Sequence, residues 1–527
     1  MRTRIGSRSC KAGVLLRRRR RRGAVAGIAA GRRRAAARLM LLGLAGLVLE
    51  TGCTVGPDYQ RPAVVTPAAF KEQGPWKPAE PGDLADRGAW WSVYGDPLLD
   101  QLEVQIDVSN QNVKQYEAAY RQAAAVVNAA QGSYFPTVSA STSAMRSGTL
   151  NGERASASSR SMNSFSVGPS ISWDADVWGK IRRTVESDVA SAQASAADIA
   201  ATRLSAQGTL ASDYLALRVA DETKRLYDAT ADAYQRSLAI TQNQYQAGIV
   251  TRADVASAQA QLENARASSI NSGVTRAQLE HAIAILIGKA PAEFSIAPVD
   301  KLIAVPPTPA AVPSTLLERR PDIAAAERLV AAKNAEIGVA LAAYYPDITL
   351  SGSLDFSSSF VDTLLHASNG IWSLGPSVSQ TLFDGGQRTA AVAEARAAYD
   401  QDVASYRQTV LSAFQAIEDD LAELRILAQQ AEVQQRAIDA AEVSVRLNLD
   451  QYRAGTVTYT SVVTAQATLL TDQQDLLTIR KSLLAASVSL IQDLGGGWNA
   501  AQLPNPTQVE QVNDQPATAT PVKATAP

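Results

Sequence analysis

One short sequence occurs twice in this chain, at two widely separated places. Residues 245–262 read YQAGIVTRADVASAQAQL and residues 452–469 read YRAGTVTYTSVVTAQATL, with ten of eighteen positions identical at a constant offset of 207. The Pro-rich segment 305–313, VPPTPAAVP, stands between the two copies. An internal repeat of this kind indicates a fold built from two equivalent halves.

Each copy of the repeat follows a long stretch with helical periodicity. Between residues 387 and 454 the sequence contains neither Pro nor Gly. Apolar residues recur there every seven positions, and the first half matches more loosely. The two series are Val403, Val410, Ile417, Leu424, Ala431, Ile438, Val445 and Tyr452, and Leu210, Leu217, Ala231, Leu238 and Tyr245. A helix of about 68 residues would be about 100 Å long, and a sustained seven-residue repeat predicts helices that supercoil on each other.

The repeated sequence itself predicts a reversal of the chain. Gly248 and Gly455 can adopt the left-handed conformation that ends a helix, and Thr251 and Thr458 are suited to cap the helix that follows. Each half is therefore expected to contain a helical hairpin, with both tips at the same end of the molecule.

Two segments in which apolar and small polar residues alternate precede each long helix, and this pattern predicts strands. Their apolar positions include Phe165, Val167, Ile171 and Trp173 in the first half and Trp372, Leu374 and Val378 in the second. Strands of about ten residues match the hydrocarbon thickness of a membrane when tilted. Four strands cannot close a barrel, so either several chains share one barrel or the strands form soluble hairpins of a periplasmic coiled-coil protein.

The N-terminus predicts export. Residues 1–52 carry thirteen Arg, one Lys and one acid, Glu50, and the apolar run 39–49 suits a signal peptide but is too short to span a bilayer. Cys53 would then be the first mature residue, and we expect it to be lipidated, although Glu50 departs from the usual pattern and an incidental Cys is the alternative. The remaining 36 basic and 50 acidic residues argue against a nucleic-acid partner, despite the arginine run at 17–22.

The remaining boundaries follow from composition. Residues 53–96 are rich in Pro, Gly and Trp and predict an extended segment that carries the lipid anchor. The two repeats are placed at 97–304 and 305–499. Residues 500–527 have few large apolar side chains and are expected to be disordered.

Nothing in the sequence predicts an enzyme. His281 and His366 are the only histidines, and no Cys/His cluster suggests a metal site or another cofactor. Asp355, Asp362 and His366 fall near one loop, where solvated side chains are a simpler interpretation than catalysis. No phosphate-binding GxxxxGK[ST] sequence occurs, so the chain is not expected to hydrolyse nucleotide.

Several motifs carry a family resemblance, in one order along the chain. They are CTVGPDYQRP (53–62), WWSVYGDPLLDQL (90–102), SYFP and its partner AYYP, DVWGKIRR (176–183), ERRPDIAAAE (318–327), LFDGGQR (382–388), and the turns YQAGIVT and YRAGTVT. With these motifs the chain resembles the TolC-like outer membrane efflux proteins of the OprM/NodT lipoprotein branch.

This resemblance implies a mainly α protein with a membrane β-barrel. Two tandem repeats, each a strand pair plus a long coiled-coil helical hairpin, would form a homotrimer whose twelve-stranded barrel continues into a periplasmic α-helical tunnel. It also implies a lipid anchor in the outer membrane, a periplasmic adaptor (membrane fusion) protein and an inner-membrane proton-driven pump. The implied function is passive export of small molecules through the outer membrane. A structural envelope protein and a duct for protein secretion are the alternatives.

In the family, contacts between neighbouring hairpin tips close the periplasmic end, and the adaptor docks there. The matching positions here are Tyr245, Gly248, Arg252, Asp254, Tyr452, Gly455 and Tyr459. Asp254 fits an acidic latch position, whereas Thr460, Thr464 and Ala467 depart from the usual second tip. Tyr245 and Tyr452 could instead simply pack the hairpins.

Overall fold

A computed structural model describes residues 54–67, 70–72, 77–78, 88–148, 162–299, 303–306, 309–310 and 319–512. All of them belong to one compact unit, Thr54–Pro527. The expected signal segment 1–52 and Cys53 lie outside the described residues.

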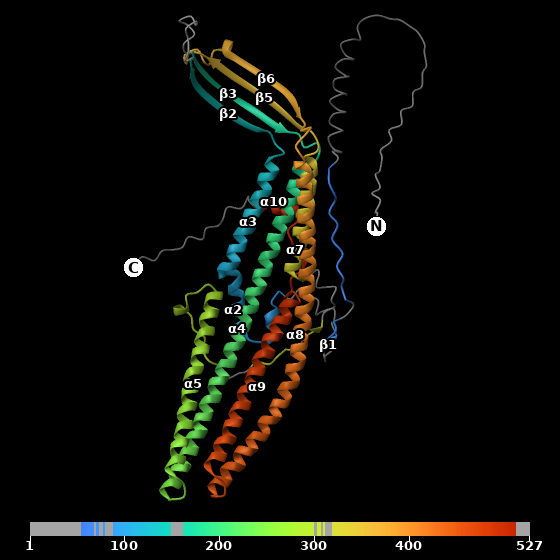
Figure 1. The fold of residues 1–527 in the computed structure, drawn as a ribbon. Coiled ribbons are helices and arrows are strands. Elements are labelled where there is room, and N and C mark those ends of the chain that lie inside the picture. Colours follow the sequence, from blue (N-terminus) through green and yellow to red (C-terminus); the bar gives the residue numbers. More distant parts are fainter. Residues whose placement is uncertain are drawn as a thin grey trace, which may run out of the picture. The chain divides into compact units, whose positions relative to one another are not determined.

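Two helical hairpins of matching length form most of the structure (Figure 1). In the first, α4 (Lys180–Gln246) is followed by α5 (Arg252–Leu286), and in the second, α8 (Gln387–Arg453) is followed by α9 (Tyr459–Asp493). Both long helices have 67 residues and both return helices have 35. The two-fold repeat expected from the sequence is thus present in the helix lengths themselves.

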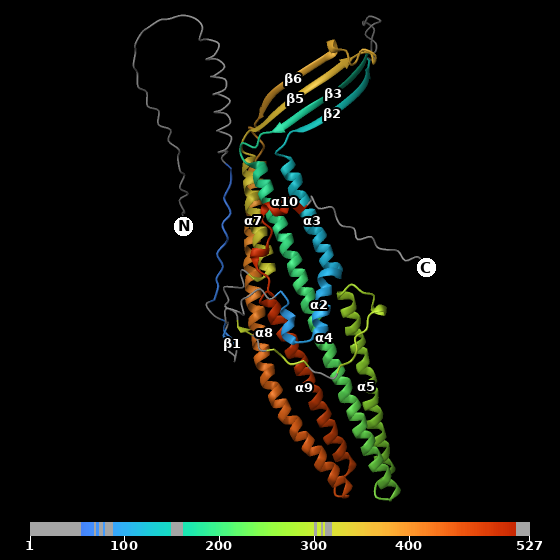
Figure 2. The same cartoon turned by 180° about the vertical axis from the view of Figure 1, so that it is seen from behind.

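The four hairpin helices are neighbours in the order α5, α4, α9, α8, because α4 packs on both α5 and α9 and α9 packs on α8. Views from opposite sides agree that α5 and α8 lie at opposite edges of this layer (Figure 1, Figure 2). Shorter helices cover the sheet-proximal part of α4 and α8. They are α2 (Pro97–Ser109), α3 (Gln111–Gly132) and α7 (Pro321–Ala342).

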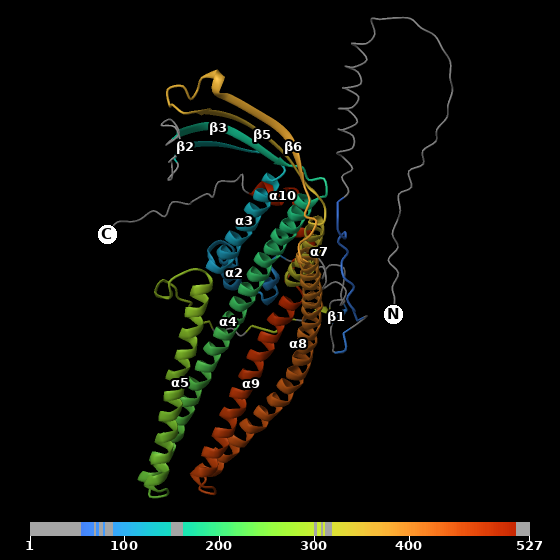
Figure 3. The ribbon, with the colours of Figure 1, turned by 45° about the horizontal axis from the view of Figure 1, so that its top comes forward.

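The strands form one four-stranded antiparallel sheet, in the order β2-β3-β5-β6. Figure 3 shows its curvature. The strands are β2 (Thr137–Ser147), β3 (Met162–Asp174), β5 (Asp347–Ser358) and β6 (Gly370–Ser379). The first and second halves of the chain meet at the β3–β5 pair, and β2 and β6 each have a single partner strand among the described residues. A separate short parallel pair joins β1 (Lys77–Pro78) to β4 (Pro309–Ala310).

A carboxylate starts each long helix at its junction with the sheet. Asp384 accepts hydrogen bonds from the N–H groups of Gly386 (3.0 Å) and Arg388 (3.1 Å) and from Arg388 Nε (2.6 Å). These contacts, the Arg388 side chain first, lower the pKa of Asp384 to about 2. Asp176 does the same before α4, where it accepts from the N–H groups of Ile181 and Arg182, both at 3.0 Å. A negative charge at a helix N-terminus also complements the helix dipole.

The segment after Cys53 runs without regular secondary structure over residues 54–67. The N–H of Val55 donates to the carbonyl of Trp178 (3.1 Å), and Asn334 Nδ2 donates to the carbonyl of Pro57 (2.9 Å). The segment is therefore fixed to both halves of the chain. Among the described helices, none is both long enough and apolar enough to cross a membrane.

The expectation of disorder over 500–527 is wrong for its first part. Helix α10 (Pro506–Gln511) begins with a capping box between Asn505 and Gln508. It buries Val509 completely in a cluster with Ala124 and Val127 of α3. The cap, the burial of Val509 and hydrogen bonds to Glu510 from Asn128 Nδ2 (3.3 Å) and Gln131 Nε2 (2.6 Å) hold the segment. Composition does not reveal contacts with residues so far away in the chain. Residues 513–527 lie outside the described part.

Candidate functional site at the hairpin tips

The first tip is a Schellman turn. Gly248 has a φ of +74°, its N–H donates to the carbonyl of Tyr245 (2.9 Å), and the N–H of Ile249 donates to that of Gln244 (2.9 Å). A Cβ at Gly248 would meet nothing within 4 Å, so the requirement for glycine comes from the backbone conformation and not from crowding.

The second tip repeats this geometry. Gly455 has a φ of +72°, its N–H donates to the carbonyl of Tyr452 (3.0 Å), and the N–H of Thr456 donates to that of Gln451 (2.9 Å). The sequence repeat at an offset of 207 is thus a repeat of one helix-ending turn.

The two return helices begin differently. Thr251 and Asp254 form a capping box at the start of α5, and Arg252, next in the chain, is exposed. Thr458 occupies the same position before α9, but its side chain makes no capping hydrogen bond. The expectation for Thr458 is therefore wrong. Its third following residue is Ser461, which lacks the carboxylate that completes the box at Asp254.

Two tyrosines join the tips of the two hairpins within one chain. Tyr452 and Tyr459 are 2% and 3% exposed, and their ring centroids lie 5.3 Å apart. Tyr452 Oη donates to Thr241 Oγ1 and Tyr459 Oη donates to Gln261 Oε1, each at 3.3 Å. Burial raises the pKa of Tyr459 to about 12 and also raises that of Tyr452, so both hydroxyls keep their protons at neutral pH.

Tyr245, the counterpart of Tyr452 in the first half, is 46% exposed. The two halves therefore use equivalent tyrosines differently, one within the chain and one on its surface.

Sequence reasoning missed several polar residues that connect the hairpins. Gln244 Nε2 donates to the carbonyl of Tyr452 (3.1 Å), and Gln466 Nε2 donates to Ser237 Oγ (3.0 Å). Ser237, Thr241 and Gln244 follow one another at helical spacings of four and three on α4. A polar row of this spacing beside an apolar seam is the signal that could have found them.

The seven residues expected on membrane strands lie on one face of the sheet. These positions, 165, 167, 171 and 173 of β3 and 372, 374 and 378 of β6, all lie on the face that carries the even-numbered residues of β5. Trp372, Leu374 and Val378 are 75%, 69% and 66% exposed. The opposite face carries cross-strand serine pairs, Ser139–Ser170 and Ser143–Ser166, each with hydroxyl oxygens 2.8 Å apart.

No group of three or more His, Cys, Asp or Glu side chains that could hold a metal ion occurs within the described part of the chain. His281 and His366 are both exposed there.

Comparison with known proteins gives consistent matches over both halves. The family model described as outer membrane efflux protein matches residues 104–289 and 312–496. The probable outer membrane lipoprotein SilC of Salmonella typhimurium is 28% identical over 466 residues, covering 88% of this chain and 99% of SilC. The probable efflux pump outer membrane protein TtgC of Pseudomonas putida is 28% identical over 497 residues, covering 92% and 99%.

Solved structures share the fold as well. The outer-membrane channel OprN superposes with a TM-score of 0.77 at 30% identity, covering 85% of this chain and 100% of that one. The open state of the MtrE outer membrane channel of Neisseria gonorrhoeae gives 0.74 at 25% identity, covering 85% and 99%. The two segments that match the family model coincide with the two structural halves, and the chain belongs to the outer membrane efflux protein family.

Proposed function

We propose that this chain works as a homotrimer, in which three sheets close one twelve-stranded barrel in the outer membrane and the helical hairpins form a tunnel below it. It is the outer membrane exit duct of a tripartite efflux pump, and small molecules cross it passively. One observation supports the trimer most directly: the sheet and the helical layer each have two outer edges that could pair with neighbouring copies.

The edge strands β2 and β6 each have one side without a partner strand among the described residues. An open edge is not tolerated in lipid, because its N–H and C=O groups have no water to bond. Pairing β6 of one copy with β2 of the next removes both edges, and three copies give twelve strands.

The helical layer has exposed apolar rows at its two outer helices. On α8, Ile426, Val433 and Leu447 fall on one heptad row and are 52%, 56% and 52% exposed. On α5, Ile270 and Ile285 are 79% and 66% exposed. Because these residues lie at opposite edges, contact between α8 of one copy and α5 of the next is heterologous, the kind of contact that forms a ring when the rotation between copies closes.

The apolar face of the sheet supports its place in the membrane. The four strands have 10 to 13 residues, the length that spans the hydrocarbon region when tilted. Trp372 and its exposed neighbours on that face would contact outer membrane lipid, and the serine face would line the lumen. Lipidation of Cys53 adds a second anchor in this proposal, and a Cys53→Ser chain is expected to lose incorporated lipid label.

The partners follow from family membership. An exit duct of this family works with a periplasmic adaptor and an inner-membrane pump, here proposed to be proton-driven. Relatives include the cation efflux system protein CusC of Escherichia coli and the toluene efflux pump protein TtgC of Pseudomonas putida. We therefore place the cargo among small molecules and not among folded proteins.

The tips are proposed as the gate and the adaptor-docking surface. Tyr452 and Tyr459 hold the two hairpins of one chain together, while Tyr245 and Arg252 are exposed and available to a neighbouring copy or an adaptor. Asp254 contributes through the capping box that shapes the first tip.

A charge placed on the α8 row tests the trimer. Val433→Asp is expected to give monomers in native mass spectrometry, where the unaltered chain gives three times the mature mass. Gln435→Asp adds the same charge at an exposed position off the row and is expected to remain trimeric. A folded, stable monomer of the unaltered chain would contradict the shared barrel, and a trimer without ion conductance in planar bilayers would favour a structural envelope protein.

A further inference from the structure

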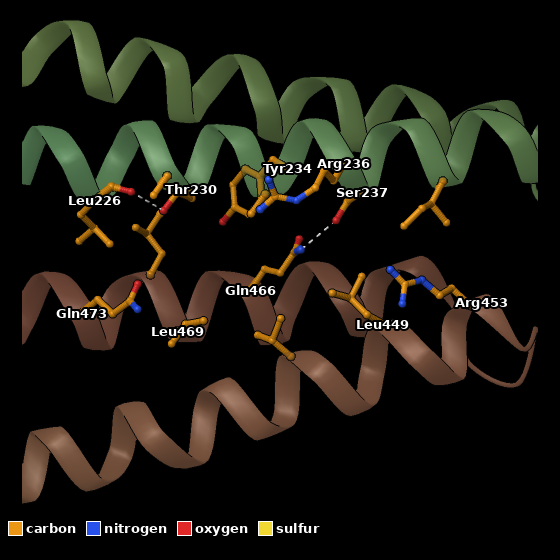
Figure 4. A pocket seen from close by; sticks show the side chains of 15 residues that line it. Leu226, Thr230, Tyr234, Arg236, Ser237, Leu449, Arg453, Gln466, Leu469 and Gln473 are labelled. Carbon is orange, nitrogen blue, oxygen red and sulfur yellow. Dashed lines mark hydrogen bonds between the residues drawn. The ribbon is translucent and has the colours of Figure 1, made fainter.

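A cavity of about 330 Å³ lies between the two hairpins, a short distance from their tips (Figure 4). Its fifteen lining residues come from α4, α8 and α9 of the same chain. The volume falls within the range of small-molecule pockets. None of the tip residues identified from the sequence lines it.

The walls are mostly aliphatic. Leu226 and Ile240 of α4 face Leu449 of α8 and Leu469 and Leu470 of α9. All five side chains are only partly buried in this chain. A ligand with an apolar body would therefore remove apolar surface from water at this place.

Gln466, a polar residue of the cavity lining, has a side-chain oxygen that no hydrogen-bond donor reaches. Gln466 is 6% exposed, and its Nε2 donates to Ser237 Oγ across the cavity at 3.0 Å. Its Oε1 is buried and accepts no hydrogen bond. A buried acceptor without a donor is costly, so a ligand N–H or O–H that reaches Oε1 would be favoured.

Two arginines make the cavity lining positively charged. The lining contains Arg236 and Arg453 and no carboxylate. Arg453 lies at the tip side of the cavity, Leu226 and Gln473 lie at the far side, and Gln466 lies between them (Figure 4). Arg453 forms an exposed ion pair with Asp450 at 3.1 Å, which is outside the cavity lining and weak enough to be shared with a ligand anion.

We propose that this inter-hairpin cavity binds a small amphiphilic anion, with its apolar body between the leucines, an N–H or O–H donor on Gln466 and its anionic group toward Arg236 and Arg453. Such a ligand contacts both hairpins of one chain. Binding does not require the chain to conduct, so the proposal stands apart from the function of the duct.

The probe is 8-anilinonaphthalene-1-sulfonate, which combines an aromatic body, one N–H donor and a sulfonate. The trimer is held in lipid nanodiscs, and fluorescence is titrated against empty nanodiscs to remove the dye that partitions into lipid. We expect a saturable component with one site per chain.

Three variants locate that component. Ala233→Trp fills the cavity and is expected to abolish saturable binding, and Gln466→Leu, which removes the acceptor, is expected to weaken it about fivefold or more. Tyr452→Phe breaks another hydrogen bond between the hairpins, to Thr241 outside the cavity lining, and is expected to bind as the unaltered chain does. Each variant is first checked for trimer yield.

Equal binding by the unaltered chain and Gln466→Leu overturns the proposal, even if Ala233→Trp does not assemble. Equal loss in Tyr452→Phe and Gln466→Leu also overturns it, because the attachment of the hairpins to each other would then matter and not the acceptor. A saturable component that disappears when Arg236 and Arg453 are both changed to Gln supports the anionic orientation, and its persistence contradicts it.

Discussion

Asp254 and Thr251 share three hydrogen bonds that involve their side chains at the first hairpin tip. Asp254 Oδ2 accepts from the Thr251 N–H (2.9 Å) and from its hydroxyl (2.8 Å), and the Asp254 N–H donates to Thr251 Oγ1 (3.3 Å). The Asp254 carboxylate therefore stabilises the turn that contains it. Asp254 could therefore affect the gate in two ways, through this cap or through a direct contact with a neighbouring copy.

Asp254→Ala and Thr251→Ala separate these two routes. Each change removes the capping box and is expected to cost about 1 kcal/mol of local helix stability. If the cap shapes the closed tip, both variants should raise single-channel conductance in planar bilayers to a similar extent, with trimer yield unchanged. A rise in Asp254→Ala alone would show that its charge acts beyond the cap, and no rise in either would remove this turn from the gate.

The link between the hairpins at Tyr452 gives a second prediction. Tyr452→Phe removes the hydrogen bond to Thr241 and is expected to weaken the contact by about 0.5–1.5 kcal/mol. Tyr452→Ala also removes the ring packed on Tyr459 and should cost about 3–5 kcal/mol, as for other buried aromatic side chains. Protease nicking at the tip turns should increase in that order. Tyr245→Phe, at the exposed equivalent position, is the matched control, and equal nicking in all three variants would contradict the link.

Much of this architecture follows from local pattern. The heptad series and the absence of Pro and Gly predicted the bounds of α8 closely. The sequence repeat predicted the glycine of each tip turn. The Gln466–Ser237 contact could not be derived in this way, since it joins residues 229 positions apart and depends on how the two hairpins are rotated. The equivalence of the halves also misled at Thr458, whose side chain makes no capping bond, and Ser461 has no carboxylate to supply the reciprocal half of a box.

The tip glycine gives a third prediction. Gly455→Val places a β-branched residue at a φ of +72°, a conformation that costs L-residues roughly 1–2 kcal/mol or more. Gly455→Asn is the matched control, because Asn tolerates this region. The Val variant should lower the thermal unfolding midpoint of the trimer and the Asn variant should change it little. Equal midpoints for both would show that the second turn is not held in this conformation.

A buried acid, Asp420, beside the partly buried Asp493 at the C-terminal end of α9 gives the last prediction. Asp420 on α8 is 8% exposed, and burial, followed by the charge of Asp493 and a hydrogen bond to it, raises the pKa of Asp420. Glu423 adds a smaller effect in the same direction, and Asp493 itself is paired with Arg320 Nη1 at 2.7 Å.

Because the folded pKa of Asp420 lies above its unfolded value of about 4, the folded state binds the extra proton. Stability from this group is complete below that unfolded value and is lost as pH rises through the folded pKa. The unfolding midpoint of the trimer should therefore fall as pH is raised from about 5 to about 8, and Asp420→Asn, which stays neutral, should reduce this slope. Asp419→Asn, at the exposed neighbouring position, should keep the slope of the unaltered chain. If Asp420→Asn and Asp419→Asn give the same slope, Asp420 does not hold its proton in the folded protein.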